Sequence, residues 1–130
     1  MKKTIILIIV ALFVVVMAGS CDLLGSTPAA RVRSFISDLD RAVSDGNISV
    51  GEAINLRSHW ASTAVESSFD DTNWNARFKG TSYSVKSLST SGDNVICVIN
   101  KGLAGDSDIT FTTVKEGNTY LLKSMTNGVF

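Results

Sequence analysis

The apolar residues of this chain change their spacing near Trp74, and that change constrains the fold more than any other feature of the sequence. From residue 28 to this point they recur at every third or fourth position, which is typical of helices that bury one face. After it they alternate with polar residues, the pattern of half-buried strands. The sequence therefore predicts a helical half followed by a strand half, which together make an α+β fold.

The first predicted helix has clear signals at both ends. Thr27 is the expected N-cap, Pro28 occupies the first helical position and Gly46 follows the end. One face of this helix should pack in the core, and the opposite face should be solvated. The apolar face consists of Val32, Phe35, Ile36, Leu39 and Val43, and the solvated face of Arg33, Ser37, Asp38 and Arg41.

The second predicted helix begins with a capping box, Ser49-Val50-Gly51-Glu52, in which each end satisfies a backbone amide of the other. We expect this helix to end around Ser67 or Ser68. Its predicted apolar stripe consists of Ala53, Ile54, Trp60, Ala61, Ala64 and Val65.

The strand half contains two hairpin signals, at residues 91–94 and 116–118, whose Gly, Asn and Asp residues tolerate positive φ. Consecutive hairpins predict an antiparallel sheet. The segment 95–99 is apolar on both faces and is expected to be a central strand. The other predicted strand residues are Trp74, Ala76 and Phe78, then Tyr83 and Val85 after an interruption at Gly80, then Ile109, Phe111 and Thr113, and finally Tyr120 and Leu122.

The first 21 residues have the layout of a secretory signal. Lys2 and Lys3 precede an uncharged apolar run, 5–18, which is shorter than the roughly 20 residues that span a bilayer. Small residues then lead to Cys21. This arrangement resembles a bacterial lipoprotein signal, in which the cysteine becomes the first mature residue and receives fatty acyl chains. The segment 18–20 also fits an ordinary A-x-A-like cleavage site, which would give a soluble secreted protein.

The resemblance implies a domain fixed to a membrane of the bacterial cell envelope and facing the periplasm or the exterior. Two or more acyl chains, such as palmitate, on Cys21 would anchor it stably. We expect residues 1–20 to be a cleaved signal peptide, 21–27 to be the lipidated cysteine and a tether, and 28–130 to be a single domain. The choice between inner and outer membrane is left open.

Charge and cysteine content exclude several classes of function. Loss of Lys2 and Lys3 leaves ten basic and twelve acidic side chains, with no basic patch of the kind that nucleic acids require. Cys97 is then the one cysteine without a predicted lipid, so no intramolecular disulfide is expected. Because its neighbours are apolar, Cys97 is predicted to be a buried, unreactive thiol.

The predicted helix, turn and helix resemble the opening of nuclear-transport-factor-2-like domains. The likeness rests on Phe35 and Ala42, the turn Asp45-Gly46-Asn47, and Ala53 and Leu56. This superfamily, also called cystatin-like, implies two N-terminal helices packed on a curved antiparallel sheet of four to five strands, in a cone-shaped roll. It further implies a pocket between helices and sheet, and in many members a dimer formed through the sheet. Some members are isomerases or dehydratases and others only bind, so the likeness assigns no reaction.

Arg57 is the strongest candidate for a binding residue. Its position in the middle of the second apolar stripe predicts a guanidinium at least partly buried, which needs an anionic or hydrogen-bonding partner. A ligand in a pocket would supply that partner, and Trp60 and Tyr83 are grouped with Arg57 as its ligand-binding lining. In the alternative interpretation, Arg57 reaches out to solvent or pairs with a carboxylate at the edge of the core.

The other polar residues that could be catalytic or metal-binding are better explained by their places in local structure. His59 neighbours polar residues on the predicted helix and is expected to be solvated. The segment 45–52 resembles half of a calcium loop but lacks the first two ligand carboxylates, and the capping box accounts for Glu52. We therefore expect no catalytic residue, no metal and no cofactor. Five aspartates are expected to lie in turns or loops, namely Asp70, Asp71, Asp93, Asp106 and Asp108.

These observations predict a non-enzymatic lipoprotein domain that binds a small ligand or a protein partner in the cell envelope. One alternative is an envelope-assembly accessory resembling the small ααβββ lipoproteins of outer-membrane barrel assembly. Another is a pocket enzyme such as an isomerase or dehydratase, which would need Arg57 or His59 to meet a carboxylate. A homodimer is left open, and no nucleic-acid partner is expected.

Overall fold

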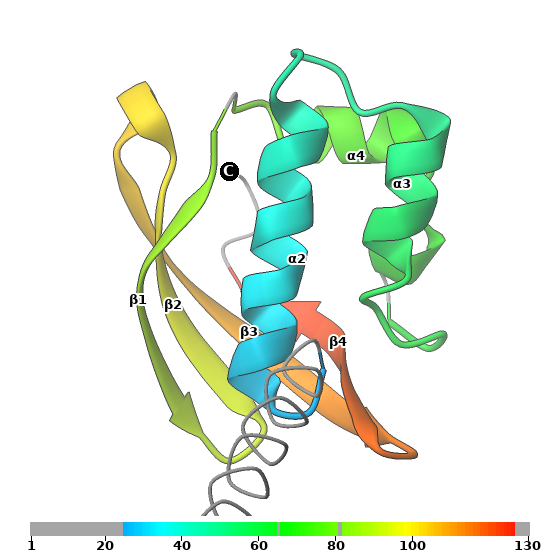
Figure 1. Ribbon diagram of the computed structural model, residues 1–130, viewed down its shortest axis with the longest axis vertical. Helices are drawn as coiled ribbons and strands as arrows, with labels where there is room; N and C mark the ends of the chain where they lie inside the picture. The colour runs from blue at the N-terminus through cyan, green and yellow to red at the C-terminus, as the bar shows by residue number, and fades with distance from the viewer. Residues whose placement is uncertain (1–24, 65, 81, 127–130) are drawn as a thin grey trace, which may run out of the picture.

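The computed structural model describes residues 25–64, 66–80 and 82–126, and these form helices that lie against an antiparallel sheet (Figure 1). The predicted signal peptide, Cys21 and the start of the tether lie outside the described residues. The helices of the described chain are α2 (Pro28–Val43), α3 (Val50–Arg57) and α4 (Asp71–Arg77), with short 3-10 turns at Glu66–Ser68 and Gly102–Ala104. The strands are β1 (Ser84–Ser91), β2 (Asn94–Asn100), β3 (Asp106–Glu116) and β4 (Thr119–Met125). The predicted α+β fold is therefore confirmed.

Helix α2 has the predicted ends and the predicted buried face. Thr27 Oγ1 accepts a hydrogen bond from the amide of Ala30 at 3.1 Å, and Gly46 adopts a φ of 84° after the last turn. All five predicted core residues of this helix are buried. The prediction that Asp38 is solvated was wrong, because its side chain is only 20% exposed and bonds to His59.

Helix α3 starts as predicted but ends much earlier. Both hydrogen bonds of the Ser49–Glu52 capping box are present. The predicted end at Ser67 or Ser68 was wrong, since the helix stops at Arg57 and the chain then turns to run beside β4. Ile54, which we placed in the apolar stripe, is 57% exposed. The backbone at Trp60 instead forms a parallel bridge with Leu122.

The first predicted strand, 74–78, is a helix in the structure. Asp70 caps α4 by accepting a hydrogen bond from the amide of Asn73 at 2.9 Å, and Asp71 lies in its first turn. Trp74 and Phe78 fit either pattern because a spacing of four also places two residues on one helix face. Their rings stack with centroids 5.3 Å apart.

The sheet has the simple order β1-β2-β3-β4, and every neighbouring pair is antiparallel. Gly92 and Gly117 have φ values of 60° and 63° in the two predicted hairpin turns. Asp106 and Asp108 were expected in turns, but both lie in β3, which begins three residues earlier along the chain than predicted. Strand β2 is central as predicted, although its outer residue Ile96 is 47% exposed, so only one of its faces is buried.

Aromatic rings fill the space between the helices and the sheet. Phe35, at the centre of α2, has ring centroids from α4, the sheet and the segment after α3 within 5.4 to 6.2 Å. Most of these contacts are edge-to-face, an arrangement that aromatic pairs favour. The surrounding rings are those of Trp60, Trp74, Phe78 and Phe111, and all of them are buried.

Candidate functional site

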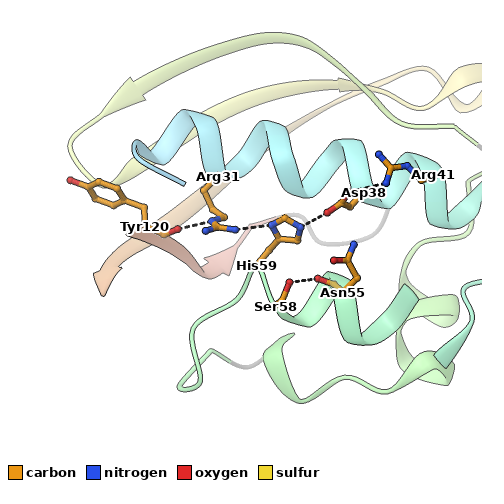
Figure 2. Close-up of polar contacts among 7 residues, drawn as sticks. All are labelled: Arg31, Asp38, Arg41, Asn55, Ser58, His59 and Tyr120. Atoms are coloured by element: carbon orange, nitrogen blue, oxygen red, sulfur yellow. Dashed lines mark hydrogen bonds and ion pairs between the residues drawn. The ribbon is translucent and has the colours of Figure 1, made fainter. Parts of the chain in front are cut away.

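The most connected polar cluster lies between α2, the segment after α3 and the start of β4. It centres on His59, whose side chain is buried, with the whole residue 4% exposed (Figure 2). Arg31 and Asp38 reach His59 from two positions on α2 that lie two helical turns apart. The prediction that His59 is a solvated surface residue was wrong, because α3 ends before it and the chain carries it into the core.

The two hydrogen bonds to His59 define its protonation state. Arg31 Nη1 lies 3.0 Å from His59 Nδ1, and His59 Nε2 lies 2.6 Å from Asp38 Oδ2. A guanidinium can only donate, so Nδ1 must accept and the ring proton must lie on Nε2. His59 is therefore neutral and donates to the Asp38 carboxylate.

Burial is the main cause that lowers the pKa of His59, because it penalises the charged ring. The hydrogen bond and negative charge of Asp38 oppose this shift, and the positive charge of Arg31 adds to it. A lowered pKa agrees with the geometry, since a second proton on His59 would lie on Nδ1 and point at the Arg31 guanidinium, which cannot accept a hydrogen bond.

Hydrogen bonds from this cluster connect α2 and the segment 59–61 to the outer edge of β4. Arg31 Nε donates to the carbonyl oxygen of Tyr120 at 2.6 Å. The amide of Leu122 donates to the His59 carbonyl, and the amide of Ala61 donates to the Leu122 carbonyl, each at 2.8 Å. We call Arg31, Asp38 and the segment 59–61 the β4 clip.

The start of the domain closes the rest of this edge. The Tyr120 amide donates to the Gly25 carbonyl at 2.7 Å, and Gly25 is buried. A Cβ atom at position 25 would collide with the Arg31 guanidinium, so a larger residue there would force this side chain to move. Residue 25, which we assigned to the tether, is thus packed against the folded domain.

The β4 clip has the parts of a proton-transfer pair but no open position for a substrate. A catalytic histidine bonded to a carboxylate must present its other nitrogen to the reacting group. Here Arg31 occupies that nitrogen, and the ring is buried. The arrangement can orient backbone and hold two segments together, and this is the role that its contacts display.

The predicted ligand-binding residues do not converge. Arg57 is half-buried at the end of α3, where its Nε donates to the Ala53 carbonyl at 3.4 Å. Its side chain makes no hydrogen bond or ring contact with Trp60 or Tyr83 among the described residues. Trp60 and Tyr83 belong to one aromatic cluster but are separated by the rings of Trp74 and Phe78.

The opposite edge of the sheet, formed by β1, lacks such a clip. No described hydrogen bond outside the β1–β2 ladder uses the backbone of Leu88 or Thr90. The hairpin turn closes on the pair Ser91–Asn94, so in the alternating antiparallel pattern the groups of Leu88 and Thr90 point away from β2. This edge therefore presents free backbone donors and acceptors.

A depression of about 310 Å³ lies between α2 and the start of β1. Its walls include Arg33, Ile36 and Asp40 from α2, and Tyr83 and Val85 from the other side. Asp40 Oδ1 accepts a hydrogen bond from the Tyr83 amide at 2.8 Å. Arg33 is exposed, and no described carboxylate lies within ion-pair distance of it.

Other candidate groups have structural roles. Burial raises the pKa of the Cys97 thiol to about 11, so this buried cysteine is unreactive. Asp45 Oδ1 accepts a hydrogen bond from the Asn47 amide in the turn after α2. Hydrogen bonds from Lys86 and Asn100 lower the pKa of Asp106, and the Lys86–Asp106 distance is 2.7 Å.

Sequence reasoning missed Arg31 and Asp38 as members of a site. A usable signal exists in the sequence, because positions 31, 35 and 38 fall on one side of α2, so two charged residues flank a core aromatic. Charged side chains so close to the buried face of a helix predict that a polar or charged residue packs against them. The partner, His59, could not be identified while the second helix was extended through it.

No protein-family model matches this chain, and neither a curated protein nor a solved structure matches it. Within the described residues, no helix has the length and apolar character needed to cross a membrane. The same residues hold no group of three or more His, Cys, Asp or Glu side chains that could bind a metal ion. The resemblances noted above therefore stay predictions.

Proposed function

We propose that this chain is a lipid-anchored lipoprotein of the bacterial cell envelope whose domain binds a protein partner through its surface and catalyses no reaction. Support for the anchor comes from the sequence, in which a short charged start and an apolar run lead to Cys21. In this proposal acyl chains on Cys21 hold the domain at a membrane.

The filled interior is the observation that favours a protein partner over a small ligand. A cone-shaped domain that encloses a ligand needs a cavity between its helices and its sheet. In this chain that space contains Phe35 surrounded by the rings of Trp60, Trp74, Phe78 and Phe111. A partner is then bound on the outside, where exposed apolar residues and an open sheet edge are available.

The blocked histidine favours a binding role over an enzymatic one. His59 does meet a carboxylate, Asp38, which was the condition set above for a pocket enzyme. Arg31 occupies the nitrogen that would serve a substrate, and the pair is buried. The assembly lipoproteins considered above have an ααβββ order, whereas the described residues here form three α-helices and four strands.

The attachment of Gly25 to β4 adds an expectation about orientation. The packed Gly25 lies only four residues after Cys21, and at about 3.3 Å per residue this separation spans at most roughly 13 Å. An anchored domain would therefore sit with the start of β4 near the bilayer. The β1 edge lies on the opposite side of the sheet and would be accessible to a partner.

Lipid attachment is tested by metabolic labelling with an alkyne-bearing fatty acid in a bacterial host. The intact chain should carry the label and fractionate with membranes, and Cys21→Ser should lose both properties. Cys97→Ser is the matched control and should keep them. A labelled Cys21→Ser chain, or an unlabelled intact chain, would contradict the anchor.

Partner binding is tested with a photo-crosslinking residue placed at one exposed position at a time in the anchored chain. Ser89 on β1, Ile96 on the outer face of β2 and Ile54 on α3 sample three surfaces. The proposal expects one surface to give a discrete crosslink to one envelope protein. Absence of crosslinks from all three, together with a co-purifying small molecule in native mass spectra, would instead favour a ligand carrier.

A further inference from the structure

The open edge of β1 and the depression beside it form a groove that suits one kind of partner. We propose that an extended, acidic protein segment binds there, adding to the sheet as a strand beside β1 and placing a carboxylate next to Arg33. This inference rests on the proposed function, because it specifies which surface binds the partner and what chemistry the partner carries.

The backbone of β1 provides the first part of the argument. Leu88 and Thr90 direct amide and carbonyl groups away from β2, and no hydrogen bond within the described residues uses these groups. An added strand would satisfy these groups in the same way that β2 satisfies the other side. By contrast, the equivalent groups of β4 at Tyr120 and Leu122 are already bonded within the chain.

The composition of β1 makes its edge compatible with an added strand. Its sequence, SVKSLSTS, contains no proline and carries mainly small hydroxyl side chains. Its one charge, Lys86, is bonded to Asp106 on β3 at 2.7 Å. Of the usual devices that block edge pairing, β1 lacks a proline and a free inward charge. The two that it does have, a lysine and a register shift, lie at residues 85–87, before Leu88 and Thr90.

The depression supplies the charge preference. An added strand would lie beside β1 at the outer edge of the sheet, next to the depression between α2 and the start of β1. Every second side chain of that strand would point to the face of the sheet on which α2 lies. Asp40 is already engaged by the Tyr83 amide, whereas Arg33 has no described carboxylate partner. A carboxylate satisfies a guanidinium with short, charge-assisted hydrogen bonds. Asp40 keeps its negative charge two helical turns along α2, so the carboxylate of the bound segment is placed beside Arg33 and not beside Asp40.

A second copy of this chain fits the groove less well. Pairing β1 with another β1 would bring no acidic residue to Arg33, because residues 84–91 contain none. The partner is accordingly a different protein with an exposed acidic stretch, and we expect residues 22–130 to be monomeric in solution.

The test is selection of binders for residues 22–130 from a phage-displayed library of random twelve-residue peptides. We expect the enriched peptides to contain Asp or Glu among β-branched residues and to lack a central proline. A synthetic peptide of that sequence should bind about tenfold or more weakly to Arg33→Glu in fluorescence anisotropy. Arg41→Glu, an exposed arginine on another face of the same helix, should keep its affinity within about twofold.

Amide hydrogen exchange then locates the bound peptide. Binding should slow exchange at Leu88 and Thr90 and leave the outer face of β2 unchanged. Failure to enrich any peptide, enrichment of peptides insensitive to Arg33→Glu, a dimer of the free chain, or protection elsewhere would each overturn the proposal. Crosslinks at Ile54 or Ile96 but not at Ser89 would overturn it while leaving the proposed function standing.

Discussion

β1 and β4 are both edge strands of the same sheet, yet the described chain covers only one of them. At β4, Gly25 and the segment 59–61 occupy the outward backbone groups, and Arg31, His59 and Asp38 hold that segment in place. At β1, the outward backbone groups of Leu88 and Thr90 make no hydrogen bond with any described segment. An open edge is therefore not an unavoidable consequence of a four-stranded sheet, because in this same fold Gly25 and the β4 clip cover the edge at β4.

The largest effect should come from breaking the β4 clip at its backbone. Ala61→Pro removes the amide that donates to the Leu122 carbonyl and places a ring at a fully buried position. We expect a loss of about 3 kcal/mol or more in the free energy of unfolding, measured by urea denaturation. Thr90→Pro, on the open edge, should cost clearly less, since its amide has no described acceptor. Equal losses would contradict the difference between the edges.

The side chains of the clip should give the next largest effect. Asp38→Ala removes the acceptor of His59 and leaves a buried ring N–H unpaired, so we expect a loss of about 2 to 3 kcal/mol. Glu116→Ala, an exposed residue at the end of β3, serves as the control and should change stability by no more than about 0.5 kcal/mol. If the two variants were equally stable, the His59–Asp38 bond would not hold the segment in place.

The clip should also make stability depend on pH with a defined sign. The pKa of His59 is lowered in the folded state from its ordinary value of 6.5. Below about pH 6.5 the unfolded chain therefore binds a proton that the folded chain does not, and unfolding becomes easier. Stability should fall as the pH drops from 7.5 through 6.5 toward the folded pKa. His59→Gln should show a flatter profile across this range, and parallel profiles would contradict the assigned neutral state.

The smallest effect concerns the indole of Trp60, which joins the clip to the core. Its Nε1 is buried and has no hydrogen-bond partner among the described residues, which is an energetic cost in the native state. Trp60→Phe removes that donor but also loses some packing, so the two terms oppose each other. We expect thermal and urea unfolding to give a net change within about 1 kcal/mol, far below a large-to-small change such as Trp60→Ala. A loss comparable to that of Trp60→Ala would show that the indole nitrogen has a partner.

Local signals in the sequence predicted much of this fold. Thr27, Pro28 and Gly46 correctly mark the limits of α2, and the glycine turns correctly place both hairpins. These features depend on a few neighbouring residues, so a single sequence contains the information. The α+β class followed from the change in apolar spacing.

The errors arose where distant parts of the chain decide the local structure. The second helix was extended past Arg57 because its apolar spacing continues, but hydrogen bonds from β4 draw residues 59–61 into the sheet. At 74–78, the spacing of Trp74 and Phe78 fits both a strand and a helix. Asp70 caps the N-terminus of this segment, which favours the helix. The same errors hid the cluster at His59, whose partners lie 21 and 28 residues away in the sequence.

Residue-resolved amide hydrogen exchange on residues 22–130 without any partner compares the two edges most directly. Within the described residues, the structure closes the edge at β4 and leaves the edge at β1 open. This difference predicts strong protection for the amides of Ala61, Tyr120 and Leu122, and rapid exchange for those of Leu88 and Thr90. Comparable protection along both edges would contradict it, as would rapid exchange at Leu122.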